Sequence, residues 1–477
     1  MFRPKYHFTV KEGYMNDPNG LIYNQKTKQY HLFYQYSKKI NTDEYFGSWI
    51  EKNWGHATST DLIHFKEEKV VLKHDSIGLI WSGSSLVDRN NALGLFDESV
   101  DTEDRFVCAY ACANDKPINN YGKICCCIAY SKDGGNNYIK YANNPVIDNL
   151  NNKYDEAFGD PKIFYLEDDY YENGGIFVMI TVLKVRIFTS TDLKNWHFES
   201  EGVCDNEPFY SECPDIFKIK IDGKDKYVYS GAGKYYIVGE FTHDENNRLI
   251  FKTESKKIEV DRGNLYATQH FYNTKDNRII QMSWMCDHSS LSLRFLNKKW
   301  DGVQSLPLEF NMYKNNDEYE ITYYPVKEIN AFRKEKSLSL KENKIVRDNL
   351  KELKSLALES FDLDAIFDVS ETNSFIFEFR KSKDETTRLY YNKEKNEVEL
   401  NTYLSGLVSH EHHHIKLKLK DNILPLRLIV DVSVIDLFVD NGKQSKSILF
   451  YPNKNSQGFK LKVDGKLIIK KFDIYKI

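Results

Sequence analysis

The sequence contains the heptapeptide Ser59-Thr60-Asp61-Leu62-Ile63-His64-Phe65, which returns as Ser190-Thr191-Asp192-Leu193-Lys194-Asn195-Trp196 and, more loosely, as Ser131-Lys132-Asp133-Gly134-Gly135-Asn136-Asn137-Tyr138. In each copy the aspartate can accept hydrogen bonds from its own backbone in a tight turn, while the closing aromatic ring packs on the adjoining sheet. Each copy also follows a strand-like run. A strand–turn–aromatic unit that recurs at this spacing is typical of a β-propeller with four-stranded blades. The alternative is a favoured hairpin turn that is reused by chance.

Aromatic residues are abundant and gather in short runs. The chain has 32 Tyr and 29 Phe, and aromatic residues make up 14% of it. Such residues favour half-buried, pleated surfaces. Because clusters of Asp, Asn and Gly separate the runs and helical periodicity is scarce, the sequence predicts many short antiparallel strands. Examples of the runs are residues 30–36, 105–110, 175–180 and 226–230.

The character of the sequence changes after Pro325. Plain alternation of apolar and polar residues follows, as in residues 374–379 and 414–419, and two dipeptides, Asn441-Gly442 and Asp464-Gly465, are signals of tight hairpins. This pattern indicates a second all-β domain of the sandwich type. We therefore predict an all-β chain with a propeller domain over residues 1–325, a linker over 326–345 and a β-sandwich over 346–477.

Charge and hydropathy argue against several classes of protein. The 477 residues include 66 Lys+Arg and 70 Asp+Glu, for a net charge of −4, whereas nucleic-acid binders concentrate basic charge. No apolar run approaches the ~20 residues of a membrane helix, and the mean hydropathy is −0.58. The first residues lack the apolar segment of a secretory signal. We expect no nucleic-acid partner, no membrane association and a cytoplasmic location.

Cysteine and histidine clusters offer two possible metal sites. Three of the eight cysteines, Cys125-Cys126-Cys127, are consecutive, which does not fit a disulfide framework, and no pair has zinc-like spacing. We interpret the cysteines as small buried side chains in a reducing compartment. The tract His410-Glu411-His412-His413-His414 has the composition of a metal site, but adjacent residues of a strand point to opposite faces, which favours a solvated loop or edge strand.

Three carboxylates stand at turns marked by proline. Asp17 precedes Pro18, Asp160 precedes Pro161, and Glu212 lies in Ser211-Glu212-Cys213-Pro214. A proline pushes the preceding residue toward extended conformations, so Asp17 and Asp160 are expected to be held stiffly where a strand meets a turn. One Asp-Pro is an ordinary turn. Three such acids in one propeller are more informative, because its inner strands converge on an axial pocket.

A group of acids with aromatic surroundings is typical of carbohydrate chemistry. Cleavage of a glycosidic bond needs one carboxylate as nucleophile or base and one protonated carboxyl group to release the leaving oxygen. Apolar ring faces for a sugar are available from Trp54, Trp81 and Trp284. From the residues alone we predict a glycosidase.

The same motifs resemble glycoside hydrolase family 32, the family of invertases, sucrose-6-phosphate hydrolases and fructanases. They occur in order over nearly the whole chain. The matching motifs are Asn16-Asp17-Pro18-Asn19-Gly20, His31-Leu32-Phe33-Tyr34-Gln35-Tyr36, Trp54-Gly55-His56-Ala57, Trp81-Ser82-Gly83-Ser84, Asp160-Pro161, Glu212-Cys213-Pro214, Leu265-Tyr266-Ala267-Thr268-Gln269, Ser283-Trp284-Met285 and the run Val430 to Gly442.

The resemblance implies a five-bladed propeller followed by a β-sandwich, and a retaining β-fructofuranosidase that acts on sucrose, sucrose 6-phosphate or short fructans through a covalent fructosyl-enzyme. Asp17 would be the nucleophile, Glu212 the acid/base and Asp160 the stabiliser of the transition state. Asn16, Gln35, Trp54, Trp81 and Ser82 match positions that line the fructose subsite, and Trp284 lies in a further matching motif. No metal or organic cofactor is expected.

Some positions depart from the family's pattern and leave alternatives open. The family usually has Arg before the second Asp, where this chain has Gly159, and Lys162 or Arg186 are the candidates to replace it. Phe46-Gly47 stands where Trp-Gly is common. A fructosyltransferase, a non-catalytic fructoside-binding protein and an inverting hydrolase of the arabinan type remain alternatives. The protein is expected to be a monomer or a homodimer.

Overall fold

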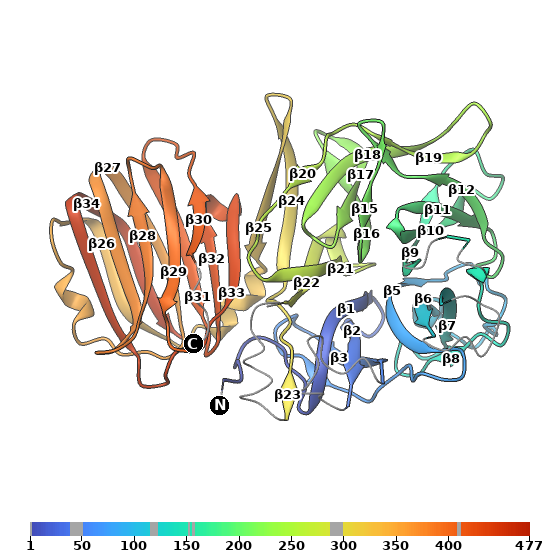
Figure 1. Cartoon of the computed structure of the whole chain (residues 1–477), viewed down its shortest axis with the longest axis horizontal. Helices are drawn as coiled ribbons and strands as arrows, with labels where there is room; N and C mark the ends of the chain where they lie inside the picture. Colours follow the sequence, from blue (N-terminus) through green and yellow to red (C-terminus); the bar gives the residue numbers. More distant parts are fainter. Residues whose placement is uncertain are drawn as a thin grey trace.

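The computed structural model describes residues 2–38, 51–114, 123–150, 153–154, 158–286, 299–407 and 412–477. Figure 1 shows two bodies side by side, one built from β1–β25 and one from β26–β34. Within the described residues regular structure is almost entirely strand, with a few short 3₁₀ turns: η1 (Thr102–Asp104), η3 (Lys275–Asn277), η4 (Lys327–Phe332), η5 (Lys351–Leu353) and η6 (Asp440–Gly442). The all-β prediction is confirmed. In this part of the chain no helix has the length and apolar character needed to cross a membrane.

The first body is a propeller of five blades, each a sheet of four or five strands. Blade 1 holds β1 (Gly13–Asn24), β2 (Gln29–Ser37), β3 (Asn53–Ser59), β4 (Lys66–Glu67) and β23 (Trp300–Asp301); blade 2 holds β5 (Leu79–Val87), β6 (Phe106–Ala113), β7 (Ile124–Ser131) and β8 (Ile139–Lys140). Blade 3 holds β9 (Gly159–Glu167), β10 (Gly175–Lys184), β11 (Arg186–Ser190), β12 (His197–Glu201) and β15 (Tyr210–Ser211). Blade 4 holds β16 (Pro214–Ile221), β17 (Lys224–Gly231), β18 (Tyr235–His243), β19 (Leu249–Thr253) and β20 (Ile258–Glu259); blade 5 holds β21 (Leu265–His270), β22 (Ile279–Met285), β24 (Leu308–Asn315) and β25 (Glu318–Pro325). A separate pair is formed by β13 (Val203–Cys204) and β14 (Glu207–Pro208).

Closure of the ring involves parallel contacts between blade 1 and residues late in the chain, including an isolated bridge between Ile22 and Tyr272. Strands within the blades pair antiparallel, but β23, which comes late in the chain, pairs parallel with β1 through Gly13 and Trp300. This contact joins the end of the propeller to its beginning. Closure fixes the inner strands around one axis, and it therefore positions the residues that these strands carry.

The repeated motif occupies the same place in three blades. Ser59 ends β3, Ser131 ends β7 and Ser190 ends β11, so each copy follows the third strand of its blade. In the first copy Asp61 accepts hydrogen bonds from the backbone of Ile63 and His64. Asp192 and Asp133 make the corresponding bonds in the other two copies. The interpretation of the repeat as a blade unit is confirmed.

The second body is one hydrogen-bonded sheet that folds over itself. Its strands are β26 (Glu335–Val346), β27 (Phe361–Lys381), β28 (Thr386–Asn392), β29 (Glu397–Leu404), β30 (His412–Lys416), β31 (Ile423–Val430), β32 (Val434–Val439), β33 (Gln444–Leu449) and β34 (Gly458–Lys476). The first half of β27 pairs with β31 and its second half with β28, while β34 runs along both halves. The two layers enclose a core that includes Phe361, Phe377 and Phe472. Strand β26 begins at Glu335, so much of the predicted linker 326–345 belongs to this sheet.

A buried histidine links the N-terminal segment to the second body. His7 Nδ1 lies 3.0 Å from Asp431 Oδ2, and its Nε2 lies 2.9 Å from Asp436 Oδ2. Both ring nitrogens therefore face carboxylate oxygens, which only accept hydrogen bonds, so the ring has to donate from both. Burial alone would lower the pKa of His7, but the charges and hydrogen bonds of Asp436 and Asp431 outweigh it and raise the pKa to about 9. At neutral pH this contact is a buried ion pair between the two parts of the protein.

Replacing His7 by Gln is expected to destabilise the protein in a pH-dependent way. Removal of the cation leaves two buried carboxylates without a counter-charge, at a cost of ~3–5 kcal/mol in the free energy of unfolding. Because the folded-state pKa is raised, this contribution is fully present below about pH 6.5 and is lost as the pH rises through about 9. Denaturant unfolding at about pH 6 and about pH 10 measures it. The exposed His64→Gln is the matched control, and an equal difference between wild type and His7→Gln at both pH values would contradict the ion pair.

Candidate active site

Two of the three predicted acids lie on the first strands of two blades, and the third lies in the connection between blades 3 and 4. Asp17 is on β1, Asp160 is the second residue of β9, and Glu212 lies between β15 and β16. The expectation of an extended backbone before proline is wrong for Asp160, whose φ is +44°, and Cys213, which precedes Pro214, has a φ of +43°. Left-handed backbone is uncommon for residues other than glycine and is concentrated at functional sites. Here it brings the Asp160 carboxylate and the Cys213 amide together.

Asp17 is a buried carboxylate surrounded by donors. Its Oδ2 accepts hydrogen bonds from Ser82 Oγ at 2.8 Å and from Gln35 Nε2 at 3.1 Å, and the Cys213 thiol lies 3.5 Å away. Burial raises the pKa of Asp17, whereas the hydrogen bond from Ser82 and the charge of Lys52 oppose this shift. The donors hold one oxygen of the carboxylate in place, as a nucleophile in a fixed orientation requires.

Cys213 links the three acids. Its backbone N–H donates to Asp160 Oδ2 at 3.0 Å, its thiol contacts Asp17, and it directly follows Glu212 in the chain. Burial and the negative charges of the three acids raise the pKa of the Cys213 thiol, so it stays protonated. This geometry fits the prediction that Cys213 supports the acids and is not itself a nucleophile.

The environments of Asp160 and Glu212 differ. Burial, together with the negative charges of Asp17 and Glu212, raises the pKa of Asp160 to about 7. Glu212 is exposed, and its Oε2 accepts a hydrogen bond from Tyr266 Oη at 2.6 Å. The Asp160 side chain is half-buried, whereas Glu212 is exposed and accessible to a substrate.

Behind these acids lies a buried ion cluster that sequence reasoning did not identify. Asp215 Oδ1 lies 2.7 Å from Lys162 Nζ, and both of its oxygens lie 2.9 Å from His270 Nδ1. Burial alone would raise the pKa of Asp215, but His270 and Lys162 lower it. Asp215 directly follows the Glu212-Cys213-Pro214 motif, which was the only sequence signal for it.

Both candidates to replace the arginine that is absent at Gly159 have partners within the protein. The Lys162 ammonium pairs with Asp215, and the Arg186 guanidinium lies 5.8 Å from the centroid of the Tyr154 ring, with Nε 3.8 Å from Glu201. The packing at Gly159 explains its small size. A Cβ there would lie 3.1 Å from the Cβ of Ala111 and 3.3 Å from Cγ2 of Ile124, so a larger residue would displace neighbouring atoms of blade 2.

The predicted binding residues divide into two groups. Asn16, Gln35 and Ser82 are buried in one hydrogen-bond network with Asp17. The side chains of Trp81 and Trp284 are partly exposed, as a sugar-binding face requires.

Trp54 differs from the prediction because it is 0% exposed and presents no ring face to a substrate. Its ring packs near Phe33 and Tyr110, and its Nε1 donates to the Trp81 carbonyl at 2.8 Å. Trp54 therefore supports the strand that carries Trp81 and Ser82.

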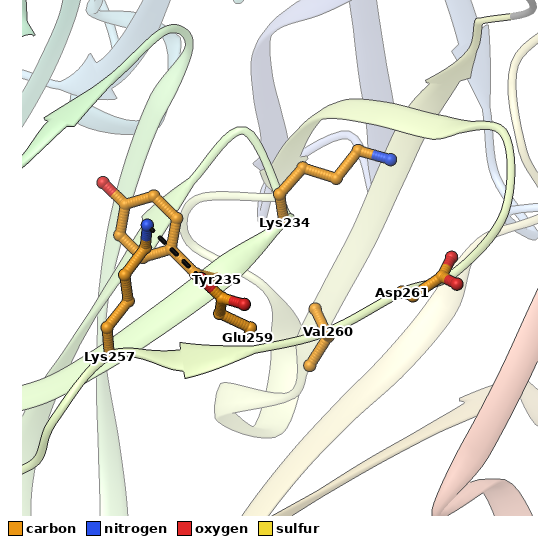
Figure 2. Close-up of a pocket in the computed structure, with 6 residues that line it drawn as sticks. All are labelled: Lys234, Tyr235, Lys257, Glu259, Val260 and Asp261. Atoms are coloured by element: carbon orange, nitrogen blue, oxygen red, sulfur yellow. Dashed lines mark ion pairs between the residues drawn. The ribbon is translucent and has the colours of Figure 1, made fainter. Parts of the chain in front are cut away.

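A pocket of about 360 Å³ lies on blade 4 (Figure 2). It is lined by Lys234, Tyr235, Lys257, Glu259, Val260 and Asp261, and Lys257 covers the Tyr235 ring at 4.2 Å from its centroid. Tyr235 Oη donates to the Tyr210 carbonyl, two residues before Glu212, and Lys234 Nζ lies 5.9 Å from the centroid of the Tyr266 ring. Two lining residues of the pocket thus approach Tyr210 and Tyr266, and the Tyr266 hydroxyl donates a hydrogen bond to Glu212.

The possible metal sites show no ligand cluster. Among the described residues, no group of three or more His, Cys, Asp or Glu side chains has an arrangement that could hold a metal ion. His412 and His414 lie on β30 and face Glu399 and Glu397, whereas His410 and Glu411 lie outside the described residues, as does Phe46-Gly47. All eight cysteines are buried, and none of them forms a disulfide bond.

The chain is similar in sequence to several known enzymes. The chain is 29% identical over 488 residues to a levanase from Bacillus subtilis (96% of this chain, 68% of that protein) and 28% identical over 514 residues to an invertase from Debaryomyces hansenii (97% and 90%). It is 27% identical over 488 residues to a fructan beta-fructosidase from Streptococcus mutans, of which it spans only 32%.

Solved structures confirm the fold. The crystal structure of exo-inulinase from Aspergillus awamori matches with a TM-score of 0.83 at 24% identity, covering 100% of this chain and 98% of that chain, and fructan 1-exohydrolase IIa from Cichorium intybus matches with a TM-score of 0.79 at 18% identity (100% and 97%). The model of the glycosyl hydrolases family 32 N-terminal domain matches residues 7–325, and that of the family's C-terminal part matches residues 328–476. The chain belongs to glycosyl hydrolase family 32.

Proposed function

We propose that this chain is a retaining β-fructofuranosidase that hydrolyses fructosides through a covalent fructosyl-enzyme on Asp17. Membership of the family makes it a glycoside hydrolase of the β-fructofuranosidase type; the roles of single residues and the choice of substrate are the proposal. One observation carries it. Cys213 brings the three acids into one site, because its amide binds Asp160, its thiol contacts Asp17, and Glu212 precedes it.

In the proposed reaction each of the three acids has one role in each step. The Asp17 carboxylate attacks the anomeric carbon of the fructosyl group, while Glu212 gives its proton to the leaving oxygen, which departs with the remaining sugar. Glu212 then takes a proton from water, whose oxygen attacks the same carbon and releases Asp17. Asp160 accepts hydrogen bonds from fructosyl hydroxyl groups as positive charge develops on the ring. Because Asp160 titrates at about 7, we expect the loss of activity toward low pH to include this group.

We propose oligosaccharide fructosides as the preferred substrates. The relatives include levanases and a fructan beta-fructosidase, and two related structures hold fructosylnystose and 1-kestose. The pocket lined by Tyr235 supports this choice. Its Lys234 lies near the ring of Tyr266, whose hydroxyl binds Glu212, and its Lys, Glu and Asp side chains are available to further sugar units. Such side chains donate hydrogen bonds to sugar hydroxyls and accept them.

Two further points concern the cellular compartment of the enzyme and the group that accepts the fructosyl unit. The eight buried cysteines, which form no disulfide bonds, support a reducing compartment such as the cytoplasm. A fructosyltransferase differs only in that a sugar, and not water, attacks the fructosyl-enzyme, and its sign would be longer oligosaccharides at high sucrose concentration.

The test is fructose release from sucrose, sucrose 6-phosphate and short inulin chains, measured in parallel with purified protein. We expect release from all fructosides that the site can hold and the highest kcat/KM for the chains longer than sucrose. Binding of fructosides without any release of fructose would overturn hydrolysis in favour of a binding protein. Equal kcat/KM for sucrose and for longer chains would overturn the proposed preference and leave hydrolysis intact.

A further inference from the structure

A lysine lies fully buried beside the nucleophile. Lys52 is 0% exposed and immediately precedes β3. Its Nζ lies 2.5 Å from Asn16 Oδ1 and 4.4 Å from the centroid of the Tyr14 ring. Lysine is almost never fully buried unless it is paired, because desolvation of an ammonium group is costly. Its place next to Asn16, and so to Asp17, indicates a role in the site.

The hydrogen bonds that start at Lys52 run in one direction and end at the nucleophile. The ammonium only donates, so Asn16 has to accept with Oδ1 and present its amide nitrogen, which donates to Gln35 Oε1 at 3.1 Å. Gln35 then presents its own nitrogen, which donates to Ser82 Oγ at 2.5 Å and to Asp17 Oδ2 at 3.1 Å. The Ser82 hydroxyl in turn donates a hydrogen bond to Asp17 Oδ2 at 2.8 Å. A donor-only group at one end and an acceptor-only carboxylate at the other fix the orientation of both amides.

We propose that Lys52 is a positioning residue for the nucleophile, which acts through Asn16 and Gln35 to aim two donors at Asp17 and which supplies a buried positive charge beside it. This inference rests on the proposed function, because it assigns Lys52 to the step in which Asp17 attacks. The inference can fail while the proposed roles of the three acids still hold.

The charges around Asp17 make Lys52 important for its ionisation. The carboxyl groups of Asp160 and Glu212 supply no positive charge beside Asp17, and the Cys213 thiol that contacts it is neutral. Burial raises the pKa of Asp17, and the positive charge of Lys52 opposes this shift. Without that charge the pKa of Asp17 rises further, and ionised nucleophile is lost at a higher pH.

The test compares the pH dependence of kcat/KM for the wild type and Lys52→Met, which keeps the length of the side chain but neither charge nor donor. We expect kcat/KM near neutral pH to fall about 10²-fold and the acidic limb of the profile to move up by about one pH unit. Lys52→Gln restores a donor without the charge, so its limb should move equally while its activity falls less. The control is Lys416→Met, an exposed lysine on β30 that removes the same charge far from the site.

A double-mutant cycle with Asn16→Leu shows whether Lys52 acts through Asn16. If it does, Lys52→Met lowers kcat/KM much less in the Asn16→Leu background than in the wild type. An unmoved acidic limb in both Lys52 variants, with only a lower melting temperature, would overturn the inference, as would full additivity in the cycle. A wild type that releases fructose from no fructoside would instead overturn the proposed function.

Discussion

Asp17→Asn removes fructose release from every substrate, with an expected fall in kcat of at least ~10⁴-fold. The amide oxygen of asparagine is a poor nucleophile, so no covalent fructosyl-enzyme forms. Without this intermediate the other groups of the site cannot complete the reaction. The side chain keeps its size and its place near Ser82 and Gln35. Because burial already disfavours the charged form of Asp17, we expect the variant to be folded and at least as stable as the wild type.

The measurement joins kinetics to direct detection of the intermediate. Acid-quenched wild type mixed with a fructoside should carry one fructosyl group by intact mass, attached at Asp17 by peptide mapping, whereas Asp17→Asn should carry none. The control is Asp225→Asn, an exposed aspartate on β17 that pairs with Lys218 and should leave both measurements unchanged. If Asp17→Asn keeps more than a few per cent of the wild-type kcat, Asp17 is not the nucleophile.

The sequence predicted the fold and the acids because each left a local signal. The Ser-x-Asp turn shows the end of a blade's third strand within seven residues. Asp17 and Asp160 each precede a proline, and Glu212 lies two residues before one. The strand pattern also indicated the second domain, but not that β26 would start at Glu335, inside the predicted linker. Alternation alone does not show where a strand finds its partner, which here is β34, at the other end of that domain.

The parts that the sequence did not predict depend on contacts between distant segments. Cys213 meets Asp17 across 196 positions and Asp160 across 53. The Lys162–Asp215 pair also joins two blades, and no local pattern reveals such pairs. Trp54 shows the converse, since its motif predicted a ring against the sugar, whereas packing buries it behind Trp81. Likewise the close approach of Ala111 to Gly159 is a property of neighbouring blades and not of the Asp-Pro motif.

Glu212→Gln is expected to slow the enzyme by an amount that depends on the leaving group. A glutamine cannot protonate the leaving oxygen, so kcat for sucrose should fall by ~10²–10⁴-fold, which is the usual contribution of general acid catalysis. In an aryl fructoside such as nitrophenyl β-fructofuranoside, the nitrophenolate group can leave without this proton. Formation of the fructosyl-enzyme from that substrate should therefore be almost unaffected. Glutamine can still accept the hydrogen bond from Tyr266 Oη, so the local structure is kept.

The second half of the reaction gives this prediction its sharpest test. Once the aryl group has left, the fructosyl-enzyme of Glu212→Gln has no base to activate water, so it should accumulate after a burst of nitrophenol. Azide needs no base, and adding it should restore turnover and give a fructosyl azide of retained configuration. Glu207→Gln, an exposed residue on β14, is the control and should behave as the wild type. An equal loss of kcat for sucrose and for the aryl fructoside, without a burst or rescue by azide, would show that Glu212 shapes the site and transfers no proton. The acid/base would then have to be sought elsewhere, first at Asp160, whose pKa of about 7 suits a proton donor.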